Sequence, residues 1–375
     1  MMRLQLQAVD TLFFRDGTPF AAENTGPRDV GGLFPPHPGS ITGALRAALA
    51  RCNGWSGAGR WPDQLNQALG PGPDDLGLLS FDGPFLVRDG QPLFAAPLHL
   101  LGANGDAGWQ PRALLQPGSP VSCDLGPAVR LPDLPPGIAL AERADLKTGE
   151  GWWLTQSGLE RVLRGDLPGA AELVASSSLW REEPRIGIER DRQRRTAREG
   201  MLYTARHVRL EPGVGLGMQI HGLDDTWNIP LKTLLPLGGE SRMAECSTWP
   251  EVPALRFPLA AIEASRRLLV VALTPLDLEA DQALGRVPLT GLGDTRVIAA
   301  CLGRPLRIGG WDSLARRPLP LQSLLPAGSV LFCTCPQPES LAEAIAGGSG
   351  MPRLGLRQRW GYGAVAFGTW SDLLE

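Results

Sequence analysis

Hydrophobic and polar residues alternate at the start of the chain, and residues 3–9 (RLQLQAV) place every second side chain on one face. A period of two predicts a strand with one buried face. Apolar residues at helical spacing follow over residues 41–49, where they share one face of a predicted helix. Ser40 precedes this run and is expected to cap the helix. The chain therefore opens with a strand followed by a helix.

A turn signal divides the next apolar region. Residues 78–87 and 92–101 flank Asp89-Gly90, a dipeptide that is typical of a β-hairpin. Residues 102–150 are rich in glycine and proline and have weak periodicity, so we expect loops there. A short helix is predicted over residues 154–163.

The character of the sequence changes near the middle of the chain. Residues 185–188 and 201–210 have the pattern of two strands, and the segment between them is polar and dense in arginine. From residue 181 to residue 209 there are nine arginines and five acidic residues, a local charge of +4. We expect a hairpin of about residues 180–210 with an arginine-rich tip.

A second series of elements follows residue 250. Buried strands are predicted over 267–274, 295–302 and 329–334, a helix over 340–346, and a last strand over 361–370. The order strand, connection, two strands, helix, strand resembles a ferredoxin-like unit. Because the first part of the chain opens in the same order, we predict an α+β protein with two tandem ferredoxin-like (RRM-like) domains and long loop and hairpin insertions.

The length of 375 residues supports two domains, because single hydrophobic cores rarely grow beyond about 250–300 residues. We place the first domain at residues 1–250, with the hairpin inserted in it, and the second at residues 251–375. The longest strongly apolar run, residues 268–273, is far too short to span a bilayer. We therefore expect a cytoplasmic protein without a membrane partner.

The net charge of −3 argues against a general nucleic-acid coat, which is usually basic. The charge is segregated, however, because the +4 of the hairpin region leaves −7 for the rest of the chain. Of the 36 basic residues only Lys147 and Lys232 are lysines, so nearly every cation can make forked contacts to phosphate or carboxylate. The pattern is that of an acidic body with one basic projection.

The tip of the predicted hairpin is the first candidate for nucleic-acid binding. Side chains at a hairpin tip can reach along a phosphate backbone. Five arginines occupy this tip, namely Arg190, Arg192, Arg194, Arg195 and Arg198, and Arg185 lies on the strand that leads to them. The interleaved acidic residues support the alternative, a solvated loop whose charges serve solubility.

The tail of the chain is the second candidate, because glycines there remove side-chain bulk and allow a sugar-phosphate chain to come close. After a GGSG segment at 347–350, the residues concerned are Gly355, Arg357, Arg359, Gly361 and Gly363. The arginines can bind phosphate, and Trp360 and Tyr362 can stack on bases. A plain turn before the terminal strand is the alternative.

Two shorter motifs combine a glycine pair with a side chain that can bind or stack. They are the GGESR of residues 238–242, which contains Arg242, and the GGWD of residues 309–312, which contains Trp311. Packing of Trp311 into a core remains equally open.

No residue pattern predicts a metal site or a cofactor. The six cysteines lack Cys-x-x-Cys spacing, so Cys333 and Cys335 are interpreted as structural thiols. His37 lies in a proline-rich loop and His207 on a predicted strand, which leaves an acid–base pair open. The residues favour a protein without enzymatic activity.

A series of short motifs runs through the chain in a fixed order. They are DTLFFRDG at 10–17, FPPHPGSITGALR at 34–46, RIGI at 185–188, TAREGMLY at 196–203, LGGESR at 237–242, GGWD at 309–312 and PAGSV at 326–330. Their order and content resemble the third subunit of the Cmr RAMP module, from type III-B CRISPR effector complexes. The resemblance covers most of the chain but not residues 102–150.

The resemblance implies two tandem RAMP domains, no catalytic centre and no cofactor. Such a subunit binds the repeat-derived 5′ handle of the crRNA and docks the large polymerase-like subunit beside the backbone RAMP subunits, and it meets target RNA only indirectly. The arginine-rich hairpin would be a thumb-like projection, and the tail matches the RAMP glycine-rich loop in part. RNA contact is also implied near the first-strand loop and helix start, for Arg15, Ser40, Thr42 and Arg46.

Three alternatives stay open. A RAMP endoribonuclease that processes precursor crRNA would need His37 or His207 as its acid–base group. The equivalent subunit of a type III-A complex is a nearer alternative, which the internal motifs disfavour. A subunit that docks proteins only would leave RNA contact to its neighbours.

Overall fold

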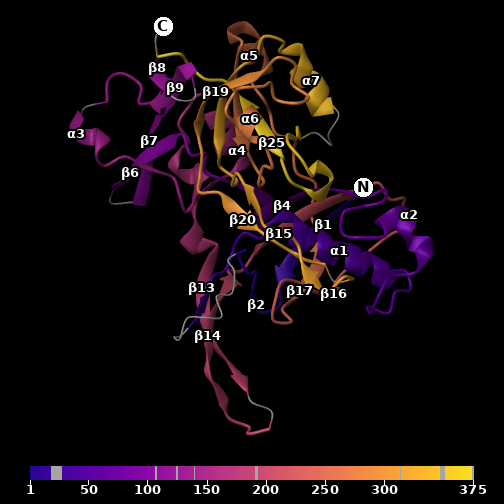
Figure 1. Cartoon of the computed structure of the whole chain (residues 1–375). Coiled ribbons are helices and arrows are strands. Elements are labelled where there is room, and N and C mark those ends of the chain that lie inside the picture. The colour runs from indigo at the N-terminus through magenta and orange to yellow at the C-terminus, as the bar shows by residue number, and fades with distance from the viewer. Residues whose placement is uncertain are drawn as a thin grey trace. The chain divides into compact units, whose positions relative to one another are not determined.

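The computed structural model describes residues 1–17, 28–105, 108–123, 126–138, 140–190, 193–312, 314–346 and 351–373. These residues form a mixed α/β protein with mostly antiparallel strands and few helices (Figure 1). The chain divides into two compact units. Unit 1 comprises residues 1–90, 177–250 and 307–323, and unit 2 comprises residues 91–176, 251–306 and 324–375. Both units are discontinuous in the chain, because residues 91–176 belong to unit 2 and residues 307–323 to unit 1.

The central sheet of unit 1 is antiparallel, and its strands follow the order β4-β15-β1-β17-β16. They are β1 (Met2–Ala8), β4 (Ser80–Arg88), β15 (Val214–His221), β16 (Leu234–Pro236) and β17 (Met243–Thr248). The predicted first strand is confirmed. Its alternation buries Leu4 and Leu6, which pair in register with Met218 and Leu216.

The first helix is also confirmed. Helix α1 (Pro38–Cys52) packs on β4 and β16 of this sheet. Ile41, Leu45 and Leu49 recur every four residues on one face and are fully buried. The connection from α1 to β4 contains the short helices η1 (Asp63–Leu65) and α2 (Asn66–Leu69).

The predicted hairpin of about residues 180–210 exists, and its two strands are longer than the predicted 185–188 and 201–210. Strands β13 (Trp180–Arg190) and β14 (Ala197–Leu210) pair antiparallel, with one register shift near the tip. The other edge of β14 pairs with β2 (Thr11–Leu12) and, in parallel, with β3 (Arg28–Val30). Figure 1 shows β13 and β14 running beyond the sheet of unit 1 as an arm.

Residues 307–323 of unit 1 contain a second, narrow hairpin. Its strands are β21 (Trp311–Asp312) and β22 (Arg317–Pro318). The flanking strands β20 (Leu306–Ile308) and β23 (Gln322–Leu324) pair with each other. The GGWD motif therefore leads into a tight turn.

The central sheet of unit 2 has four antiparallel strands in the order β19-β24-β18-β25. The strands are β18 (Arg267–Ala272), β19 (Arg296–Cys301), β24 (Val330–Thr334) and β25 (Val365–Gly368). The accompanying helices are α5 (Leu259–Ser265), α6 (Ala280–Ala283) and α7 (Glu339–Ala346). All four predicted strands and the predicted helix are confirmed, and Val270, Leu331 and Phe367 share one buried core.

The prediction of loops over residues 102–150 is wrong. This region contains β6 (Leu100–Gly105), β7 (Gly108–Leu114), β8 (Gln116–Cys123), β9 (Gly126–Asp133), α3 (Leu140–Arg143) and β10 (Lys147–Thr148). The strands form separate sheets of two and three, and their buried residues are irregularly spaced, as in β8, where only the first three of eight are buried. Prolines 117 and 120 of β8 lie where the register shifts, so they cost few ladder hydrogen bonds.

The rest of unit 2 contains β5 (Gln91–Ala95), β11 (Trp152–Leu154), β12 (Leu173–Ala175) and the short helices α4 (Gln156–Leu163), η2 (Ala170–Glu172), η3 (Ser176–Ser178) and η4 (Gln358–Trp360). Helix α4 matches the predicted helix of 154–163, and Thr155 caps it by accepting a hydrogen bond from the Gly158 amide. Within the described part of the chain, no helix has both the length and the apolar character needed to cross a membrane.

Candidate nucleic-acid interface

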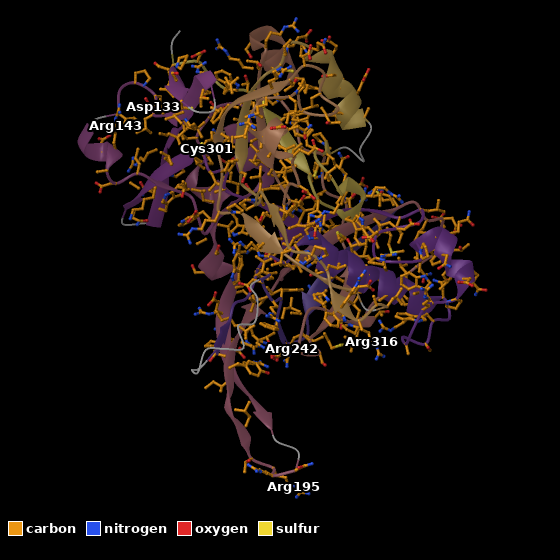
Figure 2. All side chains as sticks on the ribbon, in the orientation of Figure 1. Asp133, Arg143, Arg195, Arg242, Cys301 and Arg316 are labelled. Carbon is orange, nitrogen blue, oxygen red and sulfur yellow. The ribbon has the colours of Figure 1, made fainter. Side chains whose placement is uncertain are left out.

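The tip of the arm carries exposed arginines, as predicted. Arg194 and Arg195 are exposed, and Arg195 adopts a left-handed φ of +55° in the turn. Figure 2 places Arg195 at the far end of β13 and β14. The side chains of Arg190 and Arg198, on β13 and β14, lie outside the described residues, as does the whole of Arg192. The described tip therefore presents cations that can approach an extended polyanion.

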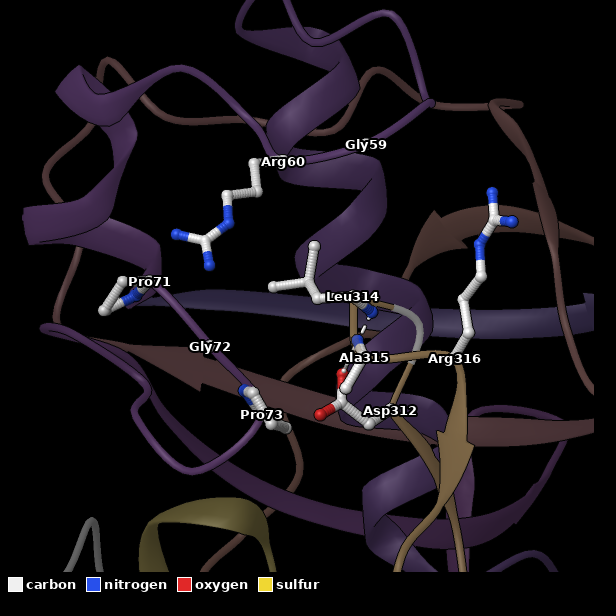
Figure 3. Close-up of a pocket in the computed structure, with 9 residues that line it drawn as sticks. All are labelled: Gly59, Arg60, Pro71, Gly72, Pro73, Asp312, Leu314, Ala315 and Arg316. Carbon is white, nitrogen blue, oxygen red and sulfur yellow. Dashed lines mark hydrogen bonds between the residues drawn. The ribbon is translucent and has the colours of Figure 1, made fainter.

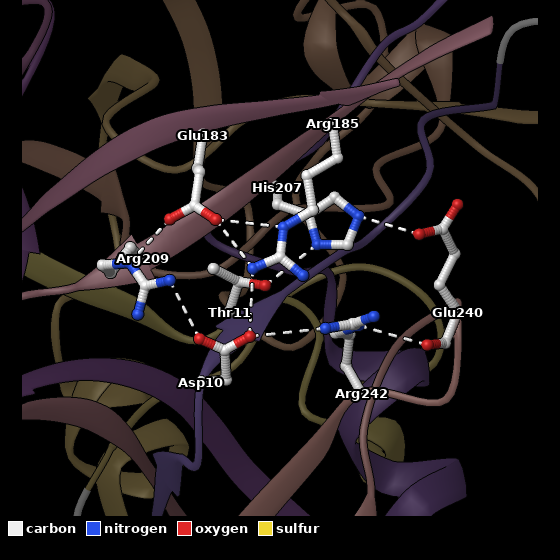
Figure 4. Close-up of polar contacts among 8 residues, drawn as sticks. All are labelled: Asp10, Thr11, Glu183, Arg185, His207, Arg209, Glu240 and Arg242. Atoms are coloured by element: carbon white, nitrogen blue, oxygen red, sulfur yellow. Dashed lines mark hydrogen bonds and ion pairs between the residues drawn. The ribbon is translucent and has the colours of Figure 1, made fainter. Parts of the chain in front are cut away.

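The base of the arm is held by a network of ion pairs (Figure 4). Asp10, which follows β1, accepts hydrogen bonds from Arg185 of β13 at 3.0 Å and from Arg209 of β14 at 2.9 Å. Glu183 bridges the same two arginines, at 2.7 Å from Arg185 and 2.6 Å from Arg209. Arg242 lies 3.5 Å from Asp10 on the other side. We call these five residues the base cluster.

The electrostatics of the base cluster favour the charged form of both acids. Hydrogen bonds from Arg185 and Arg209 lower the pKa of Asp10 to about 2, and hydrogen bonds from Arg209 and Arg185 lower the pKa of Glu183 to about 2. Arg185 and Arg242 were both predicted to bind RNA. In the structure their guanidinium groups are bonded to carboxylates, so they orient the arm rather than present unpaired charge.

Acidification is expected to loosen the base of the arm. Because both carboxyl pKa values lie below their ordinary values of 3.8 and 4.5, the ion pairs contribute stability above about pH 4.5 and lose it as the pH falls toward 2. Asp10→Asn combined with Glu183→Gln mimics the acid state, so native-state hydrogen exchange of β14 at pH 7 should be severalfold faster than in wild type. Glu182→Gln, which removes an exposed partner of Arg206 only, is the control. Equal exchange in the double variant and wild type at pH 7 would contradict this role.

A second set of contacts joins the arm to the GGESR loop. His207 of β14 is fully buried and stacks on Phe13, with ring centroids 5.1 Å apart. Its Nδ1 lies 3.0 Å from Thr11 Oγ1 and its Nε2 lies 2.9 Å from Glu240 Oε2. The hydroxyl of Tyr203 donates to Glu240 Oε1 at 3.3 Å. Glu240 therefore holds two side chains of β14 at once.

Glycines make room for this junction. A side chain at Gly187 of the RIGI motif would overlap the Tyr203 ring, which pairs with it across the hairpin. Gly238 has a φ of +82° and approaches the Phe13 carbonyl too closely for a side chain. The RIGI and GGESR motifs thus serve the attachment of the arm.

His37 and His207 do not form an exposed acid–base pair. His207 has no accessible surface, and both of its ring nitrogens lie within hydrogen-bonding distance of protein oxygens. His37 is half-buried at the N-cap position of α1, with Nε2 3.0 Å from the Ser40 hydroxyl. The helix therefore starts at Pro38, and the prediction that Ser40 caps it is wrong.

The four residues near the start of α1 for which the family resemblance implies RNA contact divide into an exposed and a buried group. Arg15 is exposed, and Ser40 is partly exposed in the first turn of the helix. Thr42 is fully buried and Arg46 is 5% exposed. The Arg46 guanidinium donates to the carbonyls of Leu69, Gly70, Gly72 and Asp75, and burial lowers its pKa to about 10. Thr42 and Arg46 are therefore part of the interior and cannot face RNA.

The glycines of the tail serve a turn. Gly355, Gly361 and Gly363 have φ values of +76°, +93° and +71°. The atoms that leave no space for a side chain are the Asp277 carbonyl at Gly355 and the Leu354 carbonyl at Gly363. The close approach is therefore made by the protein's own backbone, which the plain-turn interpretation explains. The GGSG segment of 347–350 lies outside the described residues.

Two of the tail's candidate side chains, Arg357 and Tyr362, are bonded to or buried in the protein itself. Arg357 donates to Asp277 at 2.9 Å and lies 4.3 Å from the centroid of the Tyr362 ring. Tyr362 is 2% exposed, so it cannot stack on a base. Arg359 is exposed. Of the other aromatic candidates, Trp311 is 61% exposed on the β21–β22 hairpin, which excludes packing into a core and leaves stacking available.

Sequence reasoning missed several residues that organise the interface. They are Asp10, Glu183, His207 as a buried link, Arg209 and Glu240. A signal was present for His207 and Arg209, which are two apart on the predicted strand 201–210 and so share a face; Glu183 is also two residues from Arg185 but precedes the predicted strand 185–188. The partner Asp10 lies 175 residues from Arg185 and could not be assigned from spacing.

The described residues contain no group of three or more His, Cys, Asp or Glu side chains arranged to hold a metal ion. Cys333 and Cys335 are free and buried in the core of unit 2, which fits structural thiols. Burial raises the pKa of both thiols and keeps them protonated.

Comparisons with known proteins cover nearly the whole chain. Residues 4–370 match the family described as CRISPR-associated protein (Cas_Cmr3). One similar solved chain belongs to the type III-B Cmr-beta assembly bound to cognate target RNA and AMPPnP, with 19% identity, a TM-score of 0.51, and coverage of 92% of this chain and 88% of that chain. A chain of the same assembly bound to cognate target RNA gives 19% identity and a TM-score of 0.51, with 92% and 89% covered. At this identity the likeness shows a shared fold. A search of curated proteins gave no significant match.

Proposed function

The chain belongs to the Cas_Cmr3 family of CRISPR-associated proteins, and from this premise we propose that it is a non-catalytic subunit of a type III-B CRISPR effector complex that binds the 5′ handle of the crRNA. The similar solved chains are parts of a type III-B assembly bound to target RNA. Cytoplasmic location follows from this role in RNA-guided defence.

The observation that carries the proposal is the arginine-bearing arm on its ion-paired base. The base cluster and the Glu240 contacts fix the arm to unit 1, while Arg194 and Arg195 are exposed at its end. A rigid cationic projection loses little conformational entropy when it binds a phosphate backbone. A fixed handle sequence also permits contacts to splayed bases, for which the exposed Trp311 supplies a stacking surface.

The fold supports two ferredoxin-like (RAMP) domains in tandem. If β1, β4, β15 and β17 of unit 1 are numbered 1 to 4 in chain order, they lie along the sheet in the order 2-3-1-4. In unit 2 the strands β18, β19, β24 and β25 have the same rank order, with α7 before the last strand. This is the strand order of a βαββαβ unit, in which α1 would be the first helix of unit 1. No helix of the described chain lies between β15 and β17.

The proposal includes protein partners within the complex. The chain apart from residues 181–209 carries a charge of −7, so most of its surface does not favour RNA. Surfaces of this kind suit contacts with the large polymerase-like subunit and the backbone RAMP subunits. Target RNA is then reached through the crRNA, not by direct contact with this chain.

The absence of cleavage is the first test of this proposal. Purified protein incubated with repeat RNA in the absence of divalent metal is expected to bind the RNA in a mobility-shift assay and leave it intact on a denaturing gel. The physical reason is that His207 is inaccessible and His37 is bonded to Ser40. Cleavage that His37→Ala or His207→Gln abolishes, with an unchanged circular dichroism spectrum, would replace the proposal with the endoribonuclease alternative.

A further inference from the structure

Unit 1 contains a pocket of about 500 Å³ away from the arm (Figure 3). One wall is the connection between α1 and β4, with Arg60 and the Pro71-Gly72-Pro73 segment. The other wall is the turn of the β21–β22 hairpin, with Asp312 and Arg316. This volume lies in the range of sites that enclose small ligands.

Buried polar groups hold both walls in place. The guanidinium of Arg46 donates to the carbonyls of Gly72 at 3.1 Å and Asp75 at 2.7 Å, which fixes the proline-rich wall. Asp312, 9% exposed, accepts hydrogen bonds through Oδ1 from the amides of Leu314 and Ala315, both at 2.9 Å. The pocket is therefore preorganised, and a ligand would not have to order its walls.

The pocket offers two cations and one acceptor. Arg60 and Arg316 are exposed, and neither has a hydrogen-bond or ion-pair partner among the residues that the structure describes. Figure 3 shows the second carboxylate oxygen of Asp312 pointing away from its turn, toward the wall at Pro73. Guanidinium groups suit a phosphate, and a single free carboxylate oxygen suits an amino group.

Gly72 lies on the proline-rich wall of the pocket. Its φ does not lie in the left-handed region, and a Cβ built there would meet no atom within 4 Å. The protein therefore needs glycine at this position neither for backbone conformation nor for packing. A larger side chain therefore has room at this position of the pocket wall, which makes Gly72 a site where the pocket can be altered without strain.

We propose that this pocket binds one nucleotide. Arg60 binds its phosphate, Arg316 supplies a second cation on the opposite wall, and Asp312 accepts a hydrogen bond from the exocyclic amino group of adenine, cytosine or guanine. Uracil has no exocyclic amino group and can reach this oxygen only through its ring N3–H, so we expect the pocket to bind uridine less well than the amino-bearing nucleotides. The nucleotide is either part of an RNA strand, in which case the inference rests on the proposed function, or a free mononucleotide.

The test uses the full chain with AMP, CMP, GMP and UMP in calorimetric titrations, and with a single-stranded RNA oligonucleotide in fluorescence anisotropy. Arg60→Ala with Arg316→Ala should weaken binding of the amino-bearing nucleotides about tenfold or more. Arg164→Ala with Arg286→Ala, which removes two exposed charges of unit 2, is the matched control and should change nothing. Gly72→Phe should fill the pocket and abolish binding without lowering the melting temperature.

Asp312→Asn tests the base contact separately. Asparagine can still accept the two amide hydrogen bonds of the turn, but it replaces the free acceptor with a donor. The variant should therefore bind UMP as well as it binds AMP, CMP and GMP. Loss of oligonucleotide affinity in the pocket variants identifies an RNA strand as the source, and loss of mononucleotide binding alone identifies a free nucleotide.

Unchanged mononucleotide and oligonucleotide binding in the Arg60, Arg316 and Gly72 variants would overturn the proposal that this pocket binds a nucleotide. If reversing the charge of the arm still weakens RNA binding in that case, the proposed function survives the failure of this inference. If the chain binds no RNA at all while the pocket variants lose their affinity for AMP, the nucleotide pocket is supported and the proposed function fails.

Discussion

Replacement of Arg46 by alanine is expected to lower the free energy of unfolding by about 3–5 kcal/mol, the cost of leaving several buried polar groups without partners. Arg46 is 5% exposed, and its guanidinium donates to four backbone carbonyls between the end of α2 and Asp75. None of these carbonyls gains a new donor when the side chain is removed. The segment should lose its fixed conformation together with the wall that contains Gly72. Urea denaturation followed by circular dichroism measures the change.

Two variants make this result specific. Arg46→Lys keeps the charge, but one ammonium cannot reproduce the fork that spans these carbonyls, so most of the loss should remain. Arg51→Ala, on an exposed position of the same helix, should change stability by less than about 1 kcal/mol. A small effect of Arg46→Ala, comparable to that of Arg51→Ala, would show that the buried arginine is not a structural centre of unit 1.

Reversal of charge at the end of the arm is expected to reduce the affinity for handle RNA about 100-fold or more at physiological salt, because several phosphate contacts are replaced by repulsion. The variant converts five residues to glutamate, namely Arg190, Arg192, Arg194, Arg195 and Arg198. If all five bind phosphate, the slope of log affinity against log salt should fall by roughly 3–4, at about 0.7 for each contact to a single strand. Anisotropy titrations between low and high salt measure both quantities.

A matched control separates this effect from net charge alone. Five exposed arginines of unit 2, Arg143, Arg161, Arg164, Arg256 and Arg286, can be converted to glutamate to give the same overall charge. This control should keep most of the affinity, since none of its five residues belongs to the arm. Equal loss in both variants would mean that RNA binding follows the total charge and has no specific site on the arm.

The elements that could be predicted from the sequence are those with one buried face. Strand β1 alternates because Leu4 and Leu6 pack inward, and α1 shows a period near four because Ile41, Leu45 and Leu49 do the same. The hairpin was recognisable from its two strands and polar tip. The strands of residues 102–150 escaped detection because narrow sheets need no continuous apolar face.

The candidate site was predictable at its exposed end but not at its base. Arginines at a hairpin tip are exposed for geometric reasons, and the structure places Arg194 and Arg195 accordingly. The ion pairs of Asp10 with Arg185 and Arg209 join residues 175 and 199 positions apart, which only the tertiary fold brings together. Arg46, for which the family resemblance implied RNA contact near the start of the helix, is instead buried and bonded to backbone carbonyls. Thr42 lies four residues earlier on the same face of the helix and is buried as well, which the sequence did not indicate because both residues are polar.

Nuclease protection of the crRNA in the assembled complex, read at single-nucleotide resolution, tests the central claim most directly. The complex containing wild-type subunit should protect the 5′ handle and the guide. The complex containing the charge-reversed arm should lose protection of the handle while protection of the guide persists. A handle that stays fully protected in the charge-reversed complex would contradict the assignment of this chain as the handle-binding subunit acting through its arm.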